Sequence, residues 1–441
     1  MTKVALATLG CKVNQYESAG LIEALKKKGF VHVPFNTSAD IYIVNTCTVT
    51  GKTDYQSRQL IRRAHRKNPS ASIIVTGCYA QIASKDLAIL PGVKAIVGTE
   101  HKDDIPDMIH TMTNVEQQII VSDVGSKKKC TGLAVSEFAG HTRAFLKIQD
   151  GCDAFCSYCV IPYARGRSRS LPEQEVMKRI ETLSGSGYRE IVLTGIHLGN
   201  YGYDLSPQTS LLNLLKKIEQ RQVVERLRLS SIEPMEITDE LIDYIRASQT
   251  ICRHLHVPLQ SGDDAVLQLM NRNYTADRFR ERIETIMDAI PEMAIGVDVM
   301  VGFPGEGEQE FNNTRTYIEH LPVAYLHVFP YSQRPGTAAL TLPGQVQESL
   351  KKERGKLLRN IGKKKRIDYN AKFIGKELSV LVEDATDRET GLMKGFSDNY
   401  IPVLISNGTR SLANHIVTIV ADKAEGGKIR GYKIQTSERE N

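Results

Sequence analysis

Residues 151–159 read Gly-Cys-Asp-Ala-Phe-Cys-Ser-Tyr-Cys and place Cys152, Cys156 and Cys159 in a CxxxCxxC triplet. Three thiolates this close together suit a [4Fe–4S] cluster, because soft sulfur ligands select iron–sulfur clusters and each thiolate can bind one iron. The fourth iron then has no protein ligand, which leaves a position where a small molecule can bind. A structural zinc site is the alternative, but such sites usually have paired CxxC units and a fourth Cys or His ligand.

The triplet follows an apolar segment, Ala144–Gln149, that we expect to form a strand. Further strand patterns alternate with helical ones downstream, at Glu190–Thr194, Arg226–Ser230, His254–Val257, Ala294–Val301 and Ala324–Phe329. Repeated β/α units of this kind predict an incomplete (β/α)6 barrel. The triplet then lies in the loop after the first strand, on the face where such barrels carry their active sites.

The triplet resembles that of the radical S-adenosylmethionine (SAM) superfamily. This resemblance implies that SAM binds the open iron through its amino and carboxylate groups, and that an electron from the cluster cleaves it to a 5′-deoxyadenosyl radical. The protein's part is to position the cofactor and to exclude side reactions. The loops after the second and fourth barrel strands are polar and carry glycine, so we expect the SAM pocket to include Gly195, Gln260, Ser261 and Gly262.

Three arginines, Arg165, Arg167 and Arg169, follow the triplet. Guanidinium groups suit carboxylates and phosphates, so these residues are candidates for binding the substrate, and a solvated loop is an equally good interpretation. His197 and His256 are interpreted as structural residues, since a lone histidine is more often satisfied within the fold than a ligand. The sequence assigns no catalytic acid or base.

The N-terminal region alternates short apolar strands with helices, which is typical of a doubly wound parallel sheet. Cys11, Cys47 and Cys78 each follow one of these strands. The carboxyl ends of parallel strands lie side by side, so we expect these thiols to converge on a second three-thiolate cluster site. Three buried structural cysteines are the alternative. Cys130 and Cys252 have no partner at ligand spacing and are interpreted as incidental.

The composition is that of a globular protein of about three domains. The chain has 441 residues and a net charge of +6, and no apolar run is long enough to suggest a membrane span. Its 8 cysteines point to metal ligation in a reducing cytoplasm rather than to disulfides. Cations are concentrated between Lys351 and Arg366, which predicts either a solvated helix face or a surface for RNA phosphates.

The C-terminal segment alternates as short strands, among them Glu377–Glu383, Tyr400–Ile405 and His415–Val420, which predicts a small β-barrel. Acidic and basic residues balance in this segment, so its charge does not mark it as an RNA-binding unit. The expected α/β protein therefore has three domains: 1–120 for the N-terminal sheet, 138–366 for the barrel with the basic connector at its end, and 370–436 for the C-terminal barrel.

The order of these features resembles the methylthiotransferase family along essentially the whole chain. The match is carried by Thr8-Leu-Gly-Cys-Lys-Val-Asn-Gln15, Asn45-Thr-Cys-Thr-Val-Thr50, Gly77-Cys78, the triplet with Ile161-Pro-Tyr-Ala-Arg-Gly-Arg167, and His256-Val-Pro-Leu-Gln-Ser-Gly262. The resemblance implies two [4Fe–4S] clusters and a C-terminal TRAM domain. It also implies that one SAM methylates sulfur held at the open iron of the Cys11/Cys47/Cys78 cluster, while a second yields the radical that removes a hydrogen from the substrate carbon.

Members of this family modify either an adenosine beside the tRNA anticodon or an aspartate of a ribosomal protein. Residues 45–50 most resemble the branch that acts on N6-threonylcarbamoyladenosine in tRNA, which implies transfer of a methylthio group to C2 of that base. Isopentenyladenosine in tRNA and the ribosomal aspartate are the alternatives within the family. A non-enzymatic iron–sulfur protein that binds RNA or acts as a sensor is the alternative of another class. The expected partners are tRNA, an electron-donor protein and a sulfur source, in the cytoplasm.

Overall fold

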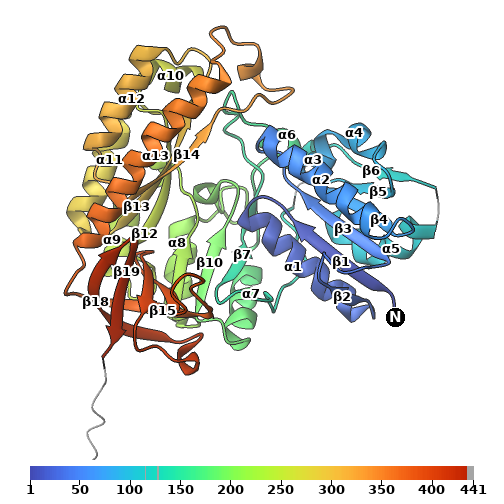
Figure 1. Cartoon of the computed structure of the whole chain (residues 1–441), viewed down its shortest axis with the longest axis horizontal. Coiled ribbons are helices and arrows are strands. Elements are labelled where there is room, and N and C mark those ends of the chain that lie inside the picture. Colours follow the sequence, from blue (N-terminus) through green and yellow to red (C-terminus); the bar gives the residue numbers. More distant parts are fainter. Residues whose placement is uncertain (115, 127–128, 435–441) are drawn as a thin grey trace, which may run out of the picture.

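The computed structural model describes residues 1–114, 116–126 and 129–434, and Figure 1 shows how the parts of the chain are arranged. The N-terminal part is a parallel sheet with the strand order β2-β1-β3-β4-β5-β6. Its strands are β1 (Lys3–Thr8), β2 (Val31–Val33), β3 (Ile41–Thr46), β4 (Ser72–Gly77), β5 (Val93–Val97) and β6 (Gln118–Ile120). The expected parallel sheet is therefore confirmed, and β1, β3 and β4 are neighbours in it.

Helices cover both faces of this sheet. They are α1 (Lys12–Lys27), α2 (Gly51–Lys67), α3 (Cys78–Ile82), α4 (Ser84–Ala88) and α5 (Ile105–Asn114). Successive strand residues point to opposite faces. Ile43 belongs to a core with Leu21 of α1 and Ile109 of α5, whereas Val44 belongs to a separate core with Ile61 of α2. Burial on both faces explains the continuous apolar runs of β3 and β4.

The central part holds the incomplete barrel as two three-stranded parallel sheets, β11-β10-β7 and β12-β13-β14. The strands are β7 (Ala144–Lys147), β10 (Glu190–Thr194), β11 (Arg226–Leu229), β12 (His254–Gln260), β13 (Ala294–Val301) and β14 (Tyr325–Pro330). Isolated bridges, Leu227 with Ile251 and Ser231 with His256, join the two sheets. Within the described ranges no pairing connects β7 to β14, so the barrel is open on that side.

Helices pack against the outside of the barrel. They are α7 (Glu173–Gly185), α8 (Leu211–Arg221), α9 (Asp239–Ala247), α10 (Asp264–Leu269), α11 (Ala276–Ala289), α12 (Glu308–His320) and α13 (Glu348–Ala371). Val257 and Leu259 of β12 belong to the core that includes Ile283 and Ile318 of these helices, so the alternate residues of β12, such as His256, face the barrel interior. The long helix α13 runs beside β14 and leads to the C-terminal part (Figure 1).

The C-terminal part is a closed barrel with the strand order β15-β16-β17-β19-β18, which confirms the expected fold. The strands are β15 (Glu377–Thr386), β16 (Met393–Ser397), β17 (Pro402–Ile405), β18 (Ile416–Glu425) and β19 (Lys428–Lys433). The sequence patterns located β15, β17 and β18 but not β16 or β19, since each of these two contains a glycine. A Cβ at Gly395 would lie 2.3 Å from Leu381 O, and one at Gly431 would lie 2.3 Å from Val420 O. Glycine is therefore needed where these strands cross their neighbours closely.

The domain boundaries at 120, 138, 366 and 370 stay predictions, and residues 435–436 of the expected C-terminal domain lie outside the described residues. None of the described helices has the length and apolar character that crossing a membrane would require. The cytoplasmic location also stays a prediction.

Candidate cluster and substrate sites

Cys11, Cys47 and Cys78 lie just beyond the carboxyl ends of three neighbouring strands, β1, β3 and β4. Gly10, next to Cys11, packs directly against Cys47. The two are so close that a Cβ added at Gly10 would lie 2.9 Å from Cys47 Sγ. Burial is the main cause that raises the pKa of Cys47 to about 11, and the nearby Cys78 thiol adds to the rise. Burial also raises the pKa of Cys78, and the Cys11 thiol adds to the rise. The three thiols thus converge at one edge of the sheet, and Cys11 is the exposed member.

The triplet lies in a loop between β8 (Gln149–Asp150) and the short helix α6 (Ile161–Arg165). β8 pairs with β9 (Arg169–Ser170), which closes the loop at its base. Cys159 N donates a hydrogen bond of 2.9 Å to Cys156 O. Burial raises the pKa of Cys159 to about 12, and the Cys156 and Cys152 thiols add to the rise. All three thiols are partly exposed and close enough to influence one another.

A cavity of about 220 Å³ adjoins the triplet, and its lining includes Cys156, His197, Glu233, Glu236 and Arg272. Arg272 Nη1 donates to Cys156 Sγ at 3.3 Å and also pairs with Glu233. His197 Nδ1 lies 3.4 Å from Cys152 Sγ, and its Nε2 lies 2.6 Å from Glu236 Oε1. Burial alone would lower the pKa of His197, but its contacts with Cys152 and Glu236 outweigh burial and raise it to about 10.

Sequence reasoning did not single out Glu236 or Arg272. Glu233 lies in a polar loop after β11, but a carboxylate in a loop carries no spacing signal. Arg272 comes from the turn after α10, where the sequence gives no indication that it reaches Cys156. His197, which we interpreted as structural, contacts Cys152 directly. Only the folded chain shows that these residues share one cavity.

The four residues predicted for the SAM pocket lie in different places. Gly195 packs against Gln149, since a Cβ there would lie 2.8 Å from Gln149 Oε1. Ser261 Oγ and Gly262 N both contact Thr314 Oγ1 of α12, at 3.0 and 3.1 Å, so their polar atoms face a helix. Gln260 lines a different cavity from the one beside Cys156. None of the four lines the 220 Å³ cavity.

The cavity that Gln260 lines has a volume of about 180 Å³ and lies between the two cysteine-bearing regions. Val49 and Thr50, from the loop after Cys47, form one side of it, and Cys159 and residues following it form another. Gln260 has a φ of 67°, and its Oε1 is buried without a hydrogen-bond partner in the described part of the chain. The cavity therefore offers a polar atom to a molecule placed between the two cysteine sets.

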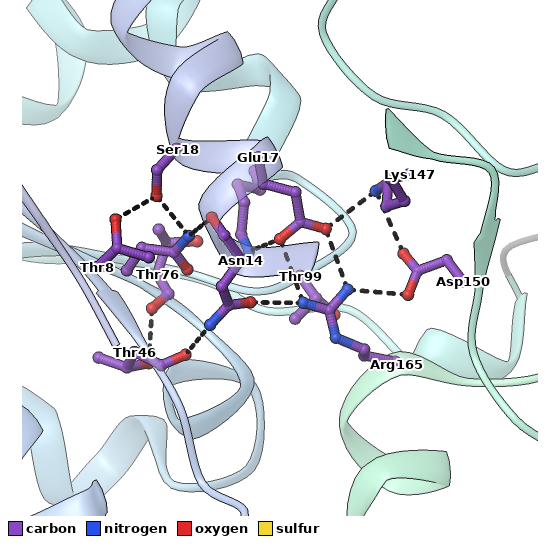
Figure 2. Close-up of polar contacts among 12 residues, drawn as sticks. Thr8, Asn14, Glu17, Ser18, Thr46, Thr76, Thr99, Lys147, Asp150 and Arg165 are labelled. Atoms are coloured by element: carbon purple, nitrogen blue, oxygen red, sulfur yellow. Dashed lines mark hydrogen bonds and ion pairs between the residues drawn. The ribbon is translucent and has the colours of Figure 1, made fainter. Parts of the chain in front are cut away.

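A buried ion network joins the N-terminal sheet to the triplet segment (Figure 2). Glu17 of α1 accepts hydrogen bonds from Arg165 Nη1 at 3.0 Å and from Lys147 Nζ at 2.9 Å, and it also pairs with Lys102. Arg165 Nη1 bonds Asp150 Oδ1 at 2.8 Å as well. Burial alone would raise the pKa of Glu17, but Arg165, Lys102 and Lys147 hold it well below its usual range.

The same network leaves the three candidate arginines in different environments. Arg165 is 1% exposed, and both its terminal nitrogens are bonded within the network. Arg169 is 4% exposed and donates to Arg167 O. Arg167 is exposed and pairs with Asp153 at 3.1 Å. Arg165 and Arg169 are therefore committed to contacts inside the protein.

Two family models match the chain. The model described as "Uncharacterized protein family UPF0004" matches residues 3–98, and that of the radical SAM superfamily matches residues 146–318. A "Threonylcarbamoyladenosine tRNA methylthiotransferase MtaB" from Bacillus subtilis is 41% identical over 96% of this chain and 94% of its own length. The chain belongs to the radical SAM methylthiotransferase family. Its enzyme class, as expected from the sequence motifs, is therefore confirmed.

Other comparisons place this methylthiotransferase in a wider group. A "tRNA-2-methylthio-N(6)-dimethylallyladenosine synthase" from Pelotomaculum thermopropionicum is 31% identical over 98% of this chain and 97% of its own length. The solved structure of the radical SAM methyltransferase TsrM from Kitasatospora setae has a TM-score of 0.53 and 16% identity, and covers 77% of each chain. At that identity the similarity to TsrM concerns the fold. The three cysteines of each set fall within a different matched region of the methylthiotransferase chain.

Proposed function

We propose that this protein transfers a methylthio group to C2 of N6-threonylcarbamoyladenosine beside the tRNA anticodon, giving 2-methylthio-N6-threonylcarbamoyladenosine. The reaction class is supported by one structural observation above all: a single cavity touches both Cys159 and the loop that follows Cys47. The choice of substrate is supported by the name of the Bacillus subtilis relative, which is more similar to this chain than the relative named for dimethylallyladenosine.

The spacing of the cysteines fits two [4Fe–4S] clusters better than two zinc ions. A zinc ion with bonds of about 2.3 Å holds its sulfur ligands within about 4.6 Å of one another. Among the described residues, His256, Asp298 and His327 are the group of three ligand side chains whose atoms all lie within 4.8 Å. Each cysteine set is therefore more open than a single ion requires. A polynuclear cluster bound by Cys11, Cys47 and Cys78, and another bound by Cys152, Cys156 and Cys159, suit that spacing.

The 220 Å³ cavity beside Cys156 is the proposed SAM site. Glu233 and Glu236 suit the amino group of SAM, and Arg272 suits its carboxylate. With SAM bound, the cluster there would supply radical chemistry, which removes a hydrogen from the substrate carbon. The chain's own residues hold the cofactor, and Arg272 also donates to Cys156 Sγ, which stabilises negative charge on that sulfur. Gln260, from the adjacent cavity, is placed to orient a group between the two cysteine sets.

Nucleoside analysis tests this function. Mass spectrometry of tRNA nucleosides from a deletion strain should show the threonylcarbamoyl nucleoside accumulating without its thiomethyl group, and the intact gene should restore it. Loss of the thiomethyl group from the isopentenyl nucleoside instead, or a mass change confined to a ribosomal protein, would contradict the substrate while leaving the reaction class intact.

A second experiment separates the enzyme from a non-enzymatic iron–sulfur protein. The purified chain, reconstituted anaerobically with iron and sulfide, should cleave SAM when reduced and should bind tRNA. A reconstituted protein that binds tRNA but never cleaves SAM would fit the non-enzymatic alternative. The electron-donor protein and the sulfur source are further proposed partners, and the same assay can be used to screen for them.

A further inference from the structure

A third cavity, of about 270 Å³, lies where all three parts of the chain meet. Lys12 of α1 enters it from the N-terminal part, next to Cys11. Arg228, His256 and Asp298 line it from the strands of the barrel, and Tyr400 closes it from the C-terminal barrel. None of the sites described above uses this cavity.

The lining of this cavity carries an excess of positive charge. Lys12, Arg143 and Arg228 face it, against a single carboxylate, Asp298. That carboxylate is already bonded, with Oδ1 2.9 Å from His256 Nε2 and 3.5 Å from His327 Nδ1. The excess of positive charge in this lining therefore favours an anion.

The three cations differ in how far they are neutralised. Arg228 donates to Glu190 at 2.7 Å, so its charge is largely compensated. Arg143 has carboxylates only at longer range, 4.0 Å from Glu190 and 3.9 Å from Glu383. Lys12 is exposed to the cavity, and its Nζ has no hydrogen bond or ion pair with any residue that the structure describes. Lys12 thus supplies the uncompensated charge, and Arg143 is only partly compensated by its two longer ion pairs.

Two further polar atoms in this lining lack partners. Ser230 Oγ and His254 Nδ1 are buried and without a hydrogen-bond partner among the described residues. Ser230 is 8% exposed and His254 is 5% exposed. Buried polar atoms are nearly always satisfied by protein, ordered water or a bound molecule, so these two are available to a polar group that enters the cavity.

We infer that this cavity binds the threonylcarbamoyl arm of the substrate nucleoside, with Lys12 and Arg143 pairing with its carboxylate. The inference rests on the proposed function and adds the residues that select the substrate. At about 30 Å³ for each water, the cavity has room for about nine waters, which is similar in size to that arm. Lys12 also places the arm beside Cys11, where the methylthio group would be held. An isopentenyl group in this cavity would leave Lys12 without a partner and Arg143 only partly compensated, so the site discriminates against it.

Binding of two modified RNAs tests this inference. The probes are an anticodon stem-loop carrying N6-threonylcarbamoyladenosine and the same RNA with its carboxyl group converted to the methyl ester. The wild-type protein should bind the acid about ten- to a hundredfold more tightly than the ester, because the ester cannot form the charge-assisted hydrogen bond. Lys12→Met should weaken binding of the acid by a similar factor and leave binding of the ester unchanged, and Lys12→Arg should retain most of the preference.

Two controls keep the result specific. Lys27→Met changes an exposed lysine on the same helix and should leave both affinities unchanged. Arg143→Gln repeats the test at a residue that, unlike Lys12, does not adjoin a cysteine of either set in the sequence. Iron content of each variant should equal that of the wild type.

The outcomes separate the inference from the function on which it rests. Equal weakening of acid and ester by Lys12→Met would mean that the charge meets a backbone phosphate, and would overturn the inference. Failure of the wild type to distinguish acid from ester would overturn it as well. Both results leave the proposed function standing if the wild type thiomethylates the threonylcarbamoyl RNA. Turnover of only the isopentenyl RNA would overturn the function and the inference together.

Discussion

Arg165 Nη2 donates a hydrogen bond of 2.6 Å to Asn14 Oδ1 and thereby joins the segment after the cysteine triplet to the helix after Cys11 (Figure 2). Asn14 Nδ2 in turn donates to Leu9 O at 2.7 Å and to Thr46 O at 3.0 Å, the two carbonyls that precede the loops of Cys11 and Cys47. Asn14 thus links the ends of β1 and β3, which precede Cys11 and Cys47, to the segment that follows the cysteine triplet.

Breaking the buried network should cost much stability. Glu17→Gln removes the charge that faces Arg165, Lys102 and Lys147, and we expect the free energy of unfolding to fall by about 3–5 kcal/mol because buried cations are left uncompensated. Urea unfolding measures this. Glu137→Gln is the control, since Glu137 forms an exposed pair with Lys26 at 4.0 Å and should change stability by less than about 1 kcal/mol. Equal midpoints for the two variants would contradict the role of the network.

The two cysteine sets should be separable in function. Replacing Cys152, Cys156 and Cys159 by Ala should abolish reductive SAM cleavage, whereas replacing Cys11, Cys47 and Cys78 should leave SAM cleavage and stop sulfur insertion. Iron per protein should fall by about half in either triple variant, because each set is proposed to bind one cluster of the same type. Cys252→Ala, at a buried thiol that belongs to neither set, should keep the full iron content. Thiomethylated product from a Cys47→Ala enzyme would rule out a role for Cys11, Cys47 and Cys78 in sulfur insertion.

Helix α13 divides its cations between the protein interior and the surface. Lys351 Nζ donates to Tyr331 O, Arg354 pairs with Glu306, and Lys365 Nζ donates to Leu321 O. The exposed cations that remain are Lys352, Lys356, Arg359, Lys363 and Lys364. Four of them, at 352, 356, 359 and 363, recur at helical spacing and form one stripe.

We expect this stripe to bind RNA phosphates. Replacing Lys352, Lys356, Arg359 and Lys363 by Gln should weaken tRNA binding and reduce the dependence of log affinity on log salt by about one unit for each phosphate that is no longer neutralised. The control is the same change at Lys216, Lys217 and Arg221, three exposed cations of α8. An unchanged salt dependence in the α13 variant would mean that the stripe is a solvated helix face.

His254 should make the protein less stable in mild acid. Its Nε2 lies 2.8 Å from Tyr325 Oη, and burial, together with Arg228, lowers its pKa well below 6.5. His254 therefore stays neutral in the folded protein, while the unfolded chain takes up a proton below about pH 6.5. Its contribution to stability is present above that pH and is lost as the pH falls, by at most about 1.4 kcal/mol per pH unit.

Urea unfolding at about pH 7.5 and about pH 5.5 checks this effect. His254→Gln should reduce the loss of stability between the two pH values, whereas His320→Gln, at an exposed position on α12, should not. Identical pH dependence in the wild type and the His254 variant would show that other groups cause the loss.

Local patterns in the sequence were sufficient for the fold but only for part of the site. The position of Cys78 follows from the strand before it and from Gly77, whose φ of 98° lets the chain turn where a Cβ would lie 2.3 Å from Thr46 O. Parallel topology then explains why Cys11, Cys47 and Cys78 meet. A prediction of this kind uses only neighbours along the chain. It succeeds for these cysteines because the parallel sheet brings the ends of its strands together.

Residues that act through long-range contacts could not be found in this way. Arg272 reaches Cys156 across 116 positions, and Lys12 meets Tyr400 in a cavity lined mostly by the central barrel. Arg165 illustrates the reverse case. Its place among other arginines suggested substrate binding or a solvated loop, whereas it is 1% exposed and donates a hydrogen bond to Glu17, far earlier in the sequence. The identity of such partners depends on how whole domains pack, which no local pattern encodes.

The bond between Arg165 and Asn14 has a consequence for how this protein can change in evolution. The side-chain oxygen of Asn14 accepts a hydrogen bond from Arg165, and its nitrogen donates to the carbonyls at two strand ends. A substitution at Asn14 or Arg165 therefore disturbs both cysteine sets at once. The N-terminal sheet and the barrel are therefore not interchangeable modules. A chimera that joins one relative's sheet to another's barrel keeps its geometry only if both carry the same pair at these positions.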